Sequence, residues 1–95
     1  LVGVCHTDLG DPSERASGYY HAPWRWPDIR RNQQWIGIFQ STDDPLIPVV
    51  EARHVASQLA CSYFEYTDRG HFTGRAAFPE LVQFVRRQLA RVSGA

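Results

Sequence analysis

The order of apolar segments is the feature that most constrains the fold of this chain. Three short runs of strand type, residues 1–5, 35–40 and 63–66, are separated by segments whose apolar residues recur with helical spacing. The run 35–40 is apolar on both faces, which is typical of central parallel strands. Strands that alternate with helices form βαβ crossovers in a parallel sheet. The sequence therefore predicts an α/β fold with three parallel strands.

The connections between these runs differ in character. Residues 6–23 are rich in Gly, Pro, Asp and Ser, which predicts a long loop before a helical stretch at 24–31. A second helix is predicted after Pro48, and a third opens around Pro79, because proline is favoured in a first helical turn. Both carry an apolar stripe suited to covering a sheet. The stripes comprise Ala52, Val55, Ala56 and Leu59, and then Phe78, Leu81, Val82, Val85, Leu89 and Val92.

Length and charge exclude several classes of protein. Ninety-five residues suffice for one domain with a modest core, so residues 1–95 are interpreted as a single, partial domain. The ten acidic and ten basic residues balance, and the arginines form no continuous face, which argues against nucleic-acid binding. No signal peptide or apolar stretch of about 18 residues is recognised, so no membrane association is expected. The location expected by default is cytoplasmic or nuclear.

Asp44 and His71 are the residues most suited to chemistry. They lie 27 positions apart (71 − 44), each just after a run of strand type. Because ligand chemistry gathers beyond the carboxyl ends of parallel strands, both side chains are expected in one crevice. A Ser-His-Asp triad needs a base that takes the serine proton and a carboxylate that orients the base. No Gly-x-Ser-x-Gly occurs in the chain, so the pattern supplies two triad members without the nucleophile.

Three motifs in this order resemble a known family. They are Asp8-Leu9-Gly10-Asp11 with Glu14-Arg15-Ala16-Ser17-Gly18-Tyr19 and Pro23-Trp24, then Ser41-Thr42-Asp43-Asp44-Pro45, then Gly70-His71-Phe72. Together they resemble the retinoblastoma-binding protein 9 family of small serine hydrolases, over nearly the whole chain. The resemblance implies the C-terminal half of an α/β-hydrolase, a fold in which the order is Ser, then Asp, then His. The family's N-terminal half, with its nucleophile elbow and oxyanion-hole loop, has no counterpart here.

Either Asp43 or Asp44 could serve as the carboxylate. Hydrolases commonly show Asp-x-x-Val/Ile-Pro after this strand, and the segment from Asp44 to Pro48 fits that frame. Asp44 is therefore the predicted triad carboxylate, and Asp43 is predicted to accept hydrogen bonds from turn amides. Gln40 stands where relatives are expected to show Gly, which predicts an altered turn at the end of the strand.

The segment 19–26 is densely aromatic. Tyr19, Tyr20, Trp24 and Trp26 lie in the connection that forms a lid in hydrolases, so they either line a substrate pocket or pack the lid onto the sheet. His6 and His21 flank the long loop of residues 6–23, where a substrate contact is conceivable. His54 shares the polar side of its predicted helix with Glu51 and Gln58 and is expected to be solvated. No histidines have zinc-ligand spacing with a suitable third partner, and no metal or cofactor is expected.

Two functions remain open from the sequence. The first is the C-terminal portion of a serine hydrolase that cleaves small ester or amide substrates, with His71 as general base and acid and Asp44 as its orienter. The second is a catalytically inactive, truncated variant that acts as a protein-interaction module. None of the six serines has the glycine-flanked context of a nucleophile, so the chain alone is expected to be inactive. Binding to the retinoblastoma protein is not supported, because the Leu-x-Cys-x-Glu motif expected for it is missing: residues 59–63 end in Tyr.

Overall fold

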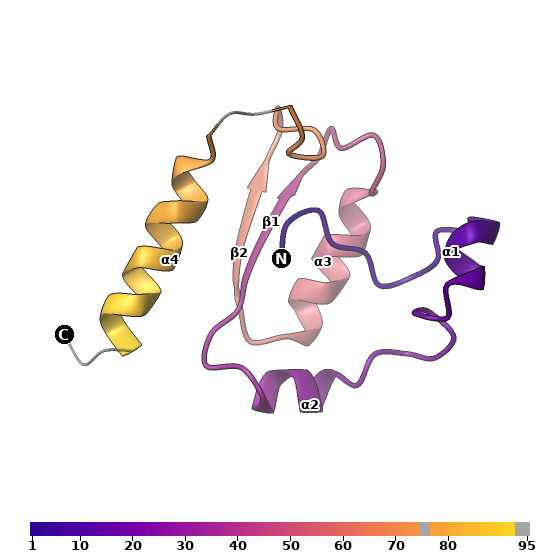
Figure 1. Ribbon diagram of the computed structural model, residues 1–95, viewed down its shortest axis with the longest axis horizontal. Helices are drawn as coiled ribbons and strands as arrows, with labels where there is room; N and C mark the ends of the chain where they lie inside the picture. Colours follow the sequence, from indigo (N-terminus) through magenta and orange to yellow (C-terminus); the bar gives the residue numbers. More distant parts are fainter. Residues whose placement is uncertain (75–76, 93–95) are drawn as a thin grey trace.

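The computed structural model describes residues 1–74 and 77–92. Its centre is a sheet of two parallel strands, β1 (Gly37–Ser41) and β2 (Ser62–Tyr66), in which Gly37 is opposite Ser62 and Ser41 is opposite Tyr66. Helix α3 (Val49–Gln58) connects the two strands, and α4 (Pro79–Val92) follows β2. In Figure 1, α3 and α4 lie on opposite sides of the sheet. The predicted mixed α/β architecture is confirmed at this level.

The first predicted strand is much shorter than expected. Of residues 1–5, only Val2 forms a parallel bridge, with Phe39 of β1. The amide of Phe39 donates to the carbonyl of Leu1 (2.8 Å), and the amide of Gly3 donates to the carbonyl of Phe39 (3.0 Å). The pairing stops there because Gly3 has a φ of +63°, which turns the chain out of the extended conformation. The described sheet therefore has two strands, with a single bridge in place of the third.

The helices follow the sequence prediction with two differences. Helix α3 begins directly after Pro48 and α4 begins at Pro79, as predicted. Helix α2 (Trp26–Arg31) begins two residues later than the predicted 24–31. The loop 6–23 contains an unexpected short helix, α1 (Pro12–Ala16), because the carboxylate of Asp11 accepts from the amides of Ser13 and Glu14.

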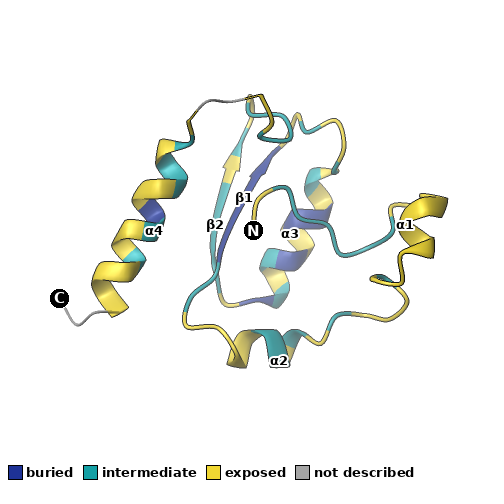
Figure 2. Cartoon of the chain, viewed as in Figure 1, coloured by how far each residue is buried: buried dark blue, intermediate teal, exposed yellow. Residues whose placement is uncertain are grey.

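Each face of the sheet is covered by one helix. Ile38 packs with Ala52 and Val55 of α3 in an apolar core cluster. On the other face, the ring of Phe84 in α4 packs edge-on against Phe39 of β1 (5.8 Å between centroids) and against a ring of β2. Figure 2 shows this burial concentrated in β1 and α3, while α1 is exposed. All five residues of β1 are buried, as expected of a central strand.

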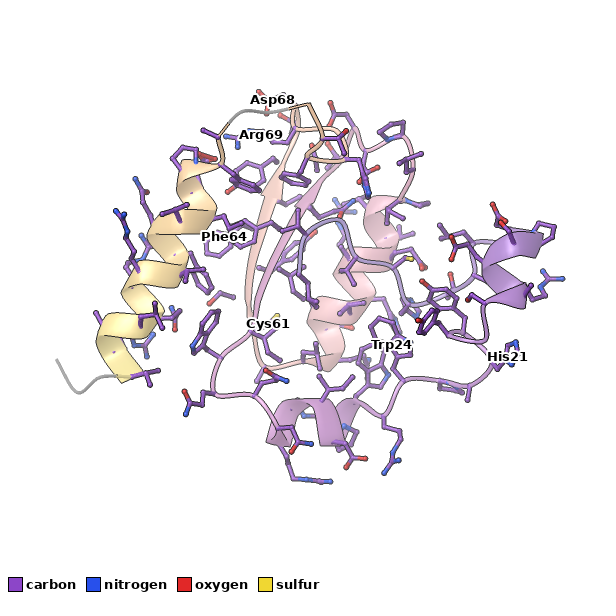
Figure 3. All side chains as sticks on the ribbon, in the orientation of Figure 1. His21, Trp24, Cys61, Phe64, Asp68 and Arg69 are labelled. Carbon is purple, nitrogen blue, oxygen red and sulfur yellow. The ribbon has the colours of Figure 1, made fainter. Side chains whose placement is uncertain are left out.

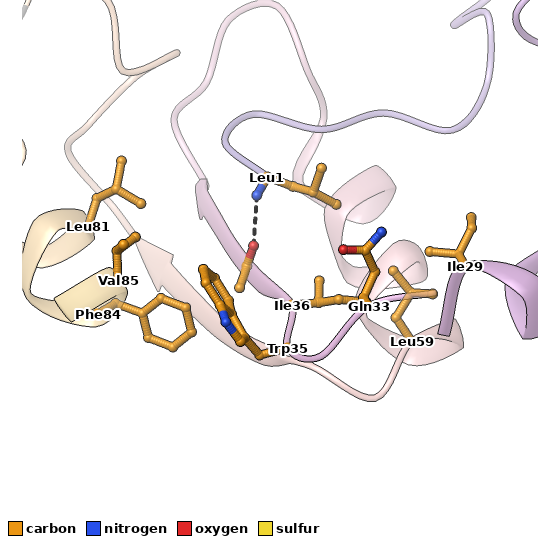
Figure 4. A pocket seen from close by; sticks show the side chains of 10 residues that line it. Leu1, Ile29, Gln33, Trp35, Ile36, Leu59, Leu81, Phe84 and Val85 are labelled. Atoms are coloured by element: carbon orange, nitrogen blue, oxygen red, sulfur yellow. Dashed lines mark hydrogen bonds between the residues drawn. The ribbon is translucent and has the colours of Figure 1, made fainter. Parts of the chain in front are cut away.

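One apolar surface remains open beside this core. An apolar groove of about 400 Å³ lies between α4, the start of β1 and the end of α2, and its walls include Ile29, Trp35, Leu59, Leu81 and Phe84. Figure 4 shows these side chains around the groove. In the part of the chain that the structure describes, every helix is too short or too polar to cross a bilayer.

Candidate active site

The structure brings the two predicted triad residues together. β1 and β2 are neighbouring parallel strands, so the loops that follow them leave the same edge of the sheet (Figure 1). Asp44 lies in the first of these loops and His71 in the second. The Nδ1 atom of His71 is 2.8 Å from Oδ2 of Asp44, which is a hydrogen bond between residues that are 27 positions apart.

Asp44 is buried and held as an anion. Its side chain is 0% exposed, its Oδ1 accepts from the amides of Leu46 (2.8 Å) and Ile47 (3.0 Å), and its Oδ2 faces His71. Burial acts to raise the pKa of the Asp44 carboxyl, but the hydrogen bonds from His71, Ile47 and Leu46 outweigh it, so the pKa is lowered overall. The carboxylate therefore stays charged, at a fixed distance from the imidazole.

The imidazole of His71 is oriented from two sides. Its side chain is 29% exposed, and it lies between Asp44 and the backbone of the N-terminal segment. A Cβ atom on Gly3 would be only 2.8 Å from Cε1 of His71 and 3.0 Å from Nδ1. With Nδ1 donating to Asp44, the neutral ring carries its acceptor at Nε2, which is the tautomer that a general base requires. The sequence did not point to Gly3, and only its positive φ and this close approach show its part in the site.

Asp43 has a structural contact and does not touch His71. Its Oδ1 accepts from the hydroxyl of Ser41 (2.5 Å) and from the amide of Gly70 (2.9 Å). The same Ser41 hydroxyl oxygen accepts from the amide of Arg69 (3.0 Å), so Asp43 and Ser41 tie the two loops together. The hydrogen bond from Ser41, followed by that from Gly70, lowers the pKa of the Asp43 carboxyl. The prediction that Asp43 accepts from a turn amide is confirmed at Gly70.

Gln40 is, after His71, the second side chain that contacts the Asp44 carboxylate. It is completely buried, and its Nε2 donates to Oδ2 of Asp44 (3.3 Å) and to the carbonyl of Ile47 (3.2 Å). Its Oε1 is buried and has no hydrogen-bond partner among residues 1–74 and 77–92. The sequence singled out Gln40 as an alteration of the turn. The structure shows that its side chain also donates to the loop after β1 and to the carboxylate that contacts His71.

The loop that carries His71 is anchored to the start of α4. The guanidinium of Arg69 pairs with Glu80 (2.5 Å) and lies over the ring of Tyr66, 4.5 Å from its centroid. These contacts fix the end of β2 and the turn that follows it. Figure 3 labels Arg69 and Asp68 in this turn.

The predicted pocket aromatics lie elsewhere. Tyr20, Trp24 and Trp26 line a separate cavity of about 390 Å³, and neither Asp44 nor His71 lines it. Tyr19 is 79% exposed and does not line that cavity. In Figure 3, Trp24 and His21 lie well away from the turn of Arg69. The structure therefore groups three of the four predicted residues with one another but not with the Asp44 and His71 pair.

Helix α3 agrees with the prediction at His54 and differs from it at Glu51. Glu51, which was placed on the polar side of this helix, is buried, because its Oε1 accepts from the amides of His6 and Thr7 (3.1 Å each) and from the Thr7 hydroxyl (2.8 Å). His54 is exposed, as predicted, and its ring also stacks on that of His6, with 4.3 Å between centroids. The described residues contain no group of three potential metal-ligating side chains.

Among the described residues, no serine hydroxyl is hydrogen-bonded to His71; its imidazole pairs with Asp44. The Ser41 hydroxyl, at the end of β1, donates to Asp43. The site therefore holds an imidazole that is oriented by a carboxylate, an arrangement that can take up and release a proton.

The comparisons with known proteins relate this chain to a serine hydrolase. No family model matches the chain. The chain is 45% identical over 89 residues to the serine hydrolase RBBP9 of Rattus norvegicus, and the match covers 94% of this chain and 47% of that protein. The chain thus spans about half the length of this relative. The resemblance to the retinoblastoma-binding protein 9 family is confirmed, and the chain is related to these serine hydrolases over almost all of its length.

Proposed function

We propose that this chain forms the C-terminal half of an α/β-hydrolase and supplies the carboxylate and the base of a Ser-His-Asp triad. The observation that carries the proposal is the 2.8 Å hydrogen bond between His71 Nδ1 and the buried Oδ2 of Asp44. The similarity to a serine hydrolase over 94% of the chain supports the same chemistry. In this arrangement Val2 and its neighbours continue the sheet as the third parallel strand.

The proposed mechanism assigns one step to each group. His71 Nε2 takes the proton of a serine hydroxyl as the oxygen attacks an ester or amide carbonyl, and it returns that proton to the leaving group. Asp44 holds the tautomer and stabilises the imidazolium that forms. The serine and the oxyanion hole come from residues outside this chain, and the substrate class is small esters or amides.

The first experiment tests the chain by itself. It should show no labelling by a fluorophosphonate probe, because it lacks a serine in a nucleophile context next to His71. Labelling at any of its serines would contradict the proposed division of the triad. The same probe should label the chain once it is extended at its N-terminus by the residues that carry a Gly-x-Ser-x-Gly.

The second experiment separates the two aspartates in the extended protein. Asp44→Asn should lower kcat by several orders of magnitude with little change in KM, because the amide would stabilise the wrong imidazole tautomer. Asp43→Asn is the matched control, since Asp43 is adjacent but binds Ser41 and Gly70 rather than His71. Equal losses in the two variants, or a larger loss at Asp43, would contradict the assignment.

A second candidate function, a protein-interaction module without catalysis, is favoured by one observation. The apolar groove leaves Trp35, Leu81 and other apolar side chains on an open surface. This candidate requires the extended protein to lack a reactive serine. Failure of the extended protein to label, together with an intact fold, would select this function over the hydrolase.

A further inference from the structure

The cavity of about 390 Å³ beside α3 has walls built mainly of rings. Its lining includes His6, Tyr20, Trp24, Trp26 and His54, which come from the N-terminal segment, the loop before α2, α2 itself and α3. We call this the aromatic cavity. Its volume lies within the range of ligand sites, about 300–1,000 Å³. It is separate from the candidate active site, because neither Asp44 nor His71 lines it.

The rings of the aromatic cavity are held by contacts with one another. His6 and His54 stack at 4.3 Å with 20° between their planes, and Trp26 meets both edge-on, at 6.1 Å and 5.9 Å. The indoles of Trp24 and Trp26 are 5.5 Å apart at an angle of 46°. Since the two indoles are tilted rather than stacked, neither covers the face of the other. The wall therefore keeps π surface that can face a ligand.

Among the residues that the structure describes, the lining of the aromatic cavity carries one carboxylate and no guanidinium group. The carboxylate belongs to Asp8, and its Oδ2 pairs with Arg15, a residue outside the lining (3.1 Å). A second carboxylate, Glu51, is buried behind His6, with its Oε2 3.4 Å from His6 Nε2. All ten basic residues of the chain are arginines, and arginine is the usual partner for a bound anion. Because no described arginine lines the aromatic cavity, its walls are poorly suited to an anion.

A metal ion fits this wall less well than an organic cation does. The imidazoles of His6 and His54 are nearly parallel, so their nitrogens lie side by side instead of converging on one point. Aromatic faces backed by a carboxylate are the groups that recognise quaternary and alkylated ammonium ions. We propose that the aromatic cavity binds an organic ammonium ion of about the size of choline. The proposal does not depend on the hydrolase function, because the two sites share no residue.

The test uses choline and its uncharged isostere 3,3-dimethylbutan-1-ol, titrated into the chain at pH 8. The chain contains three tryptophans, and their indole N–H signals in NMR report on position. Trp24 and Trp26 line the aromatic cavity, whereas Trp35 lines the apolar groove and serves as an internal control. We expect saturable shifts at Trp24 and Trp26 with choline, and binding of the alcohol about three- to fivefold weaker, as a cation–π contribution at an open site implies.

Two pairs of variants complete the test. Tyr20→Leu should weaken choline binding, while Tyr19→Leu should not, because Tyr19 is its neighbour in sequence but does not line the cavity. Asp8→Asn keeps every ring and removes the carboxylate together with its ion pair to Arg15, so it should weaken binding of choline but not of the alcohol. The proposal would be overturned by equal affinity for the two ligands, by shifts as large at Trp35, or by an unchanged choline affinity in Asp8→Asn. An absence of saturable shifts up to tens of millimolar choline would overturn it as well.

Discussion

Gly3 is where a single methyl group should disturb the candidate active site most directly. Its φ is +63°, and an added Cβ would lie 2.8 Å from Cε1 of His71, closer than non-bonded carbon atoms approach one another. Gly3→Ala therefore imposes backbone strain and also forces the imidazole of His71 to move. Because the ring is held at 2.8 Å from Asp44, that movement must weaken their hydrogen bond.

The loss of unfolding free energy expected for Gly3→Ala has two parts. A non-glycine residue in the left-handed region costs about 1–2 kcal/mol. Overpacking against a held side chain adds typically about 1–3 kcal/mol. Gly10→Ala is the matched control, since Gly10 has a φ of +73° and its Cβ would meet no atom within 4 Å. We expect Gly10→Ala to lower the free energy of unfolding by the first amount only, and Gly3→Ala by the sum.

Urea unfolding followed by circular dichroism measures both free energies. NMR of chain labelled with ¹⁵N-histidine reports on the Nδ1 proton of His71, which is assigned by comparison with His71→Gln. Gly3→Ala should shift this signal, and Gly10→Ala should leave it in place. The reasoning would be refuted if the two variants lost the same stability and both kept the His71 signal of the original chain.

Three further predictions rest on other contacts. Gly37→Ala would place a Cβ 2.4 Å from Cε1 of Phe84, so α4 must shift; the free energy of unfolding should fall by about 1–3 kcal/mol in urea titrations, and an unchanged value would contradict the packing of α4 on β1. The hydrogen bonds from Arg53 and then Tyr63 lower the pKa of Glu65 from 4.5 to about 2. The stability that this carboxylate contributes is therefore present above pH 4.5 and is lost as the pH falls towards 2. Glu65→Gln should flatten that part of the curve of unfolding free energy against pH, and identical curves for the two proteins would refute the linkage. The open apolar groove should bind a hydrophobic dye and make the chain elute as a dimer or larger in size exclusion, whereas a monomer with a sharp thermal transition and no dye binding would show that the groove is closed in solution.

The sequence was sufficient to predict the central elements. Strands β1 and β2 and helices α3 and α4 follow from patterns within each segment, because the period of apolar residues and the helix-starting prolines act locally. The meeting of Asp44 and His71 could also be predicted, since consecutive parallel strands end at the same edge of a sheet. Their proximity follows from the order of the strands and does not depend on how individual side chains pack.

Other features depended on contacts between distant segments. Helical periodicity put Glu51 on the polar side of α3, but the amides of His6 and Thr7 in the N-terminal segment bury its carboxylate. Residues 1–5 have strand propensity, but the left-handed conformation of Gly3 ends the strand pairing. Nothing in the local sequence indicates that Gly3 lies against His71.

The aromatic residues give the same contrast. Their density in residues 19–26 predicted that they line a cavity or pack a lid. The sequence does not indicate whether they lie beside His71 or beside α3. Stacking of His6 on His54, and the edge contacts of Trp26 with both, set the wall beside α3. The sequence by itself therefore determined the type and order of the central elements and the pairing of Asp44 with His71. Only the tertiary structure decided which distant side chains share a cavity, because such contacts depend on how the segments pack in space and leave no period in the sequence.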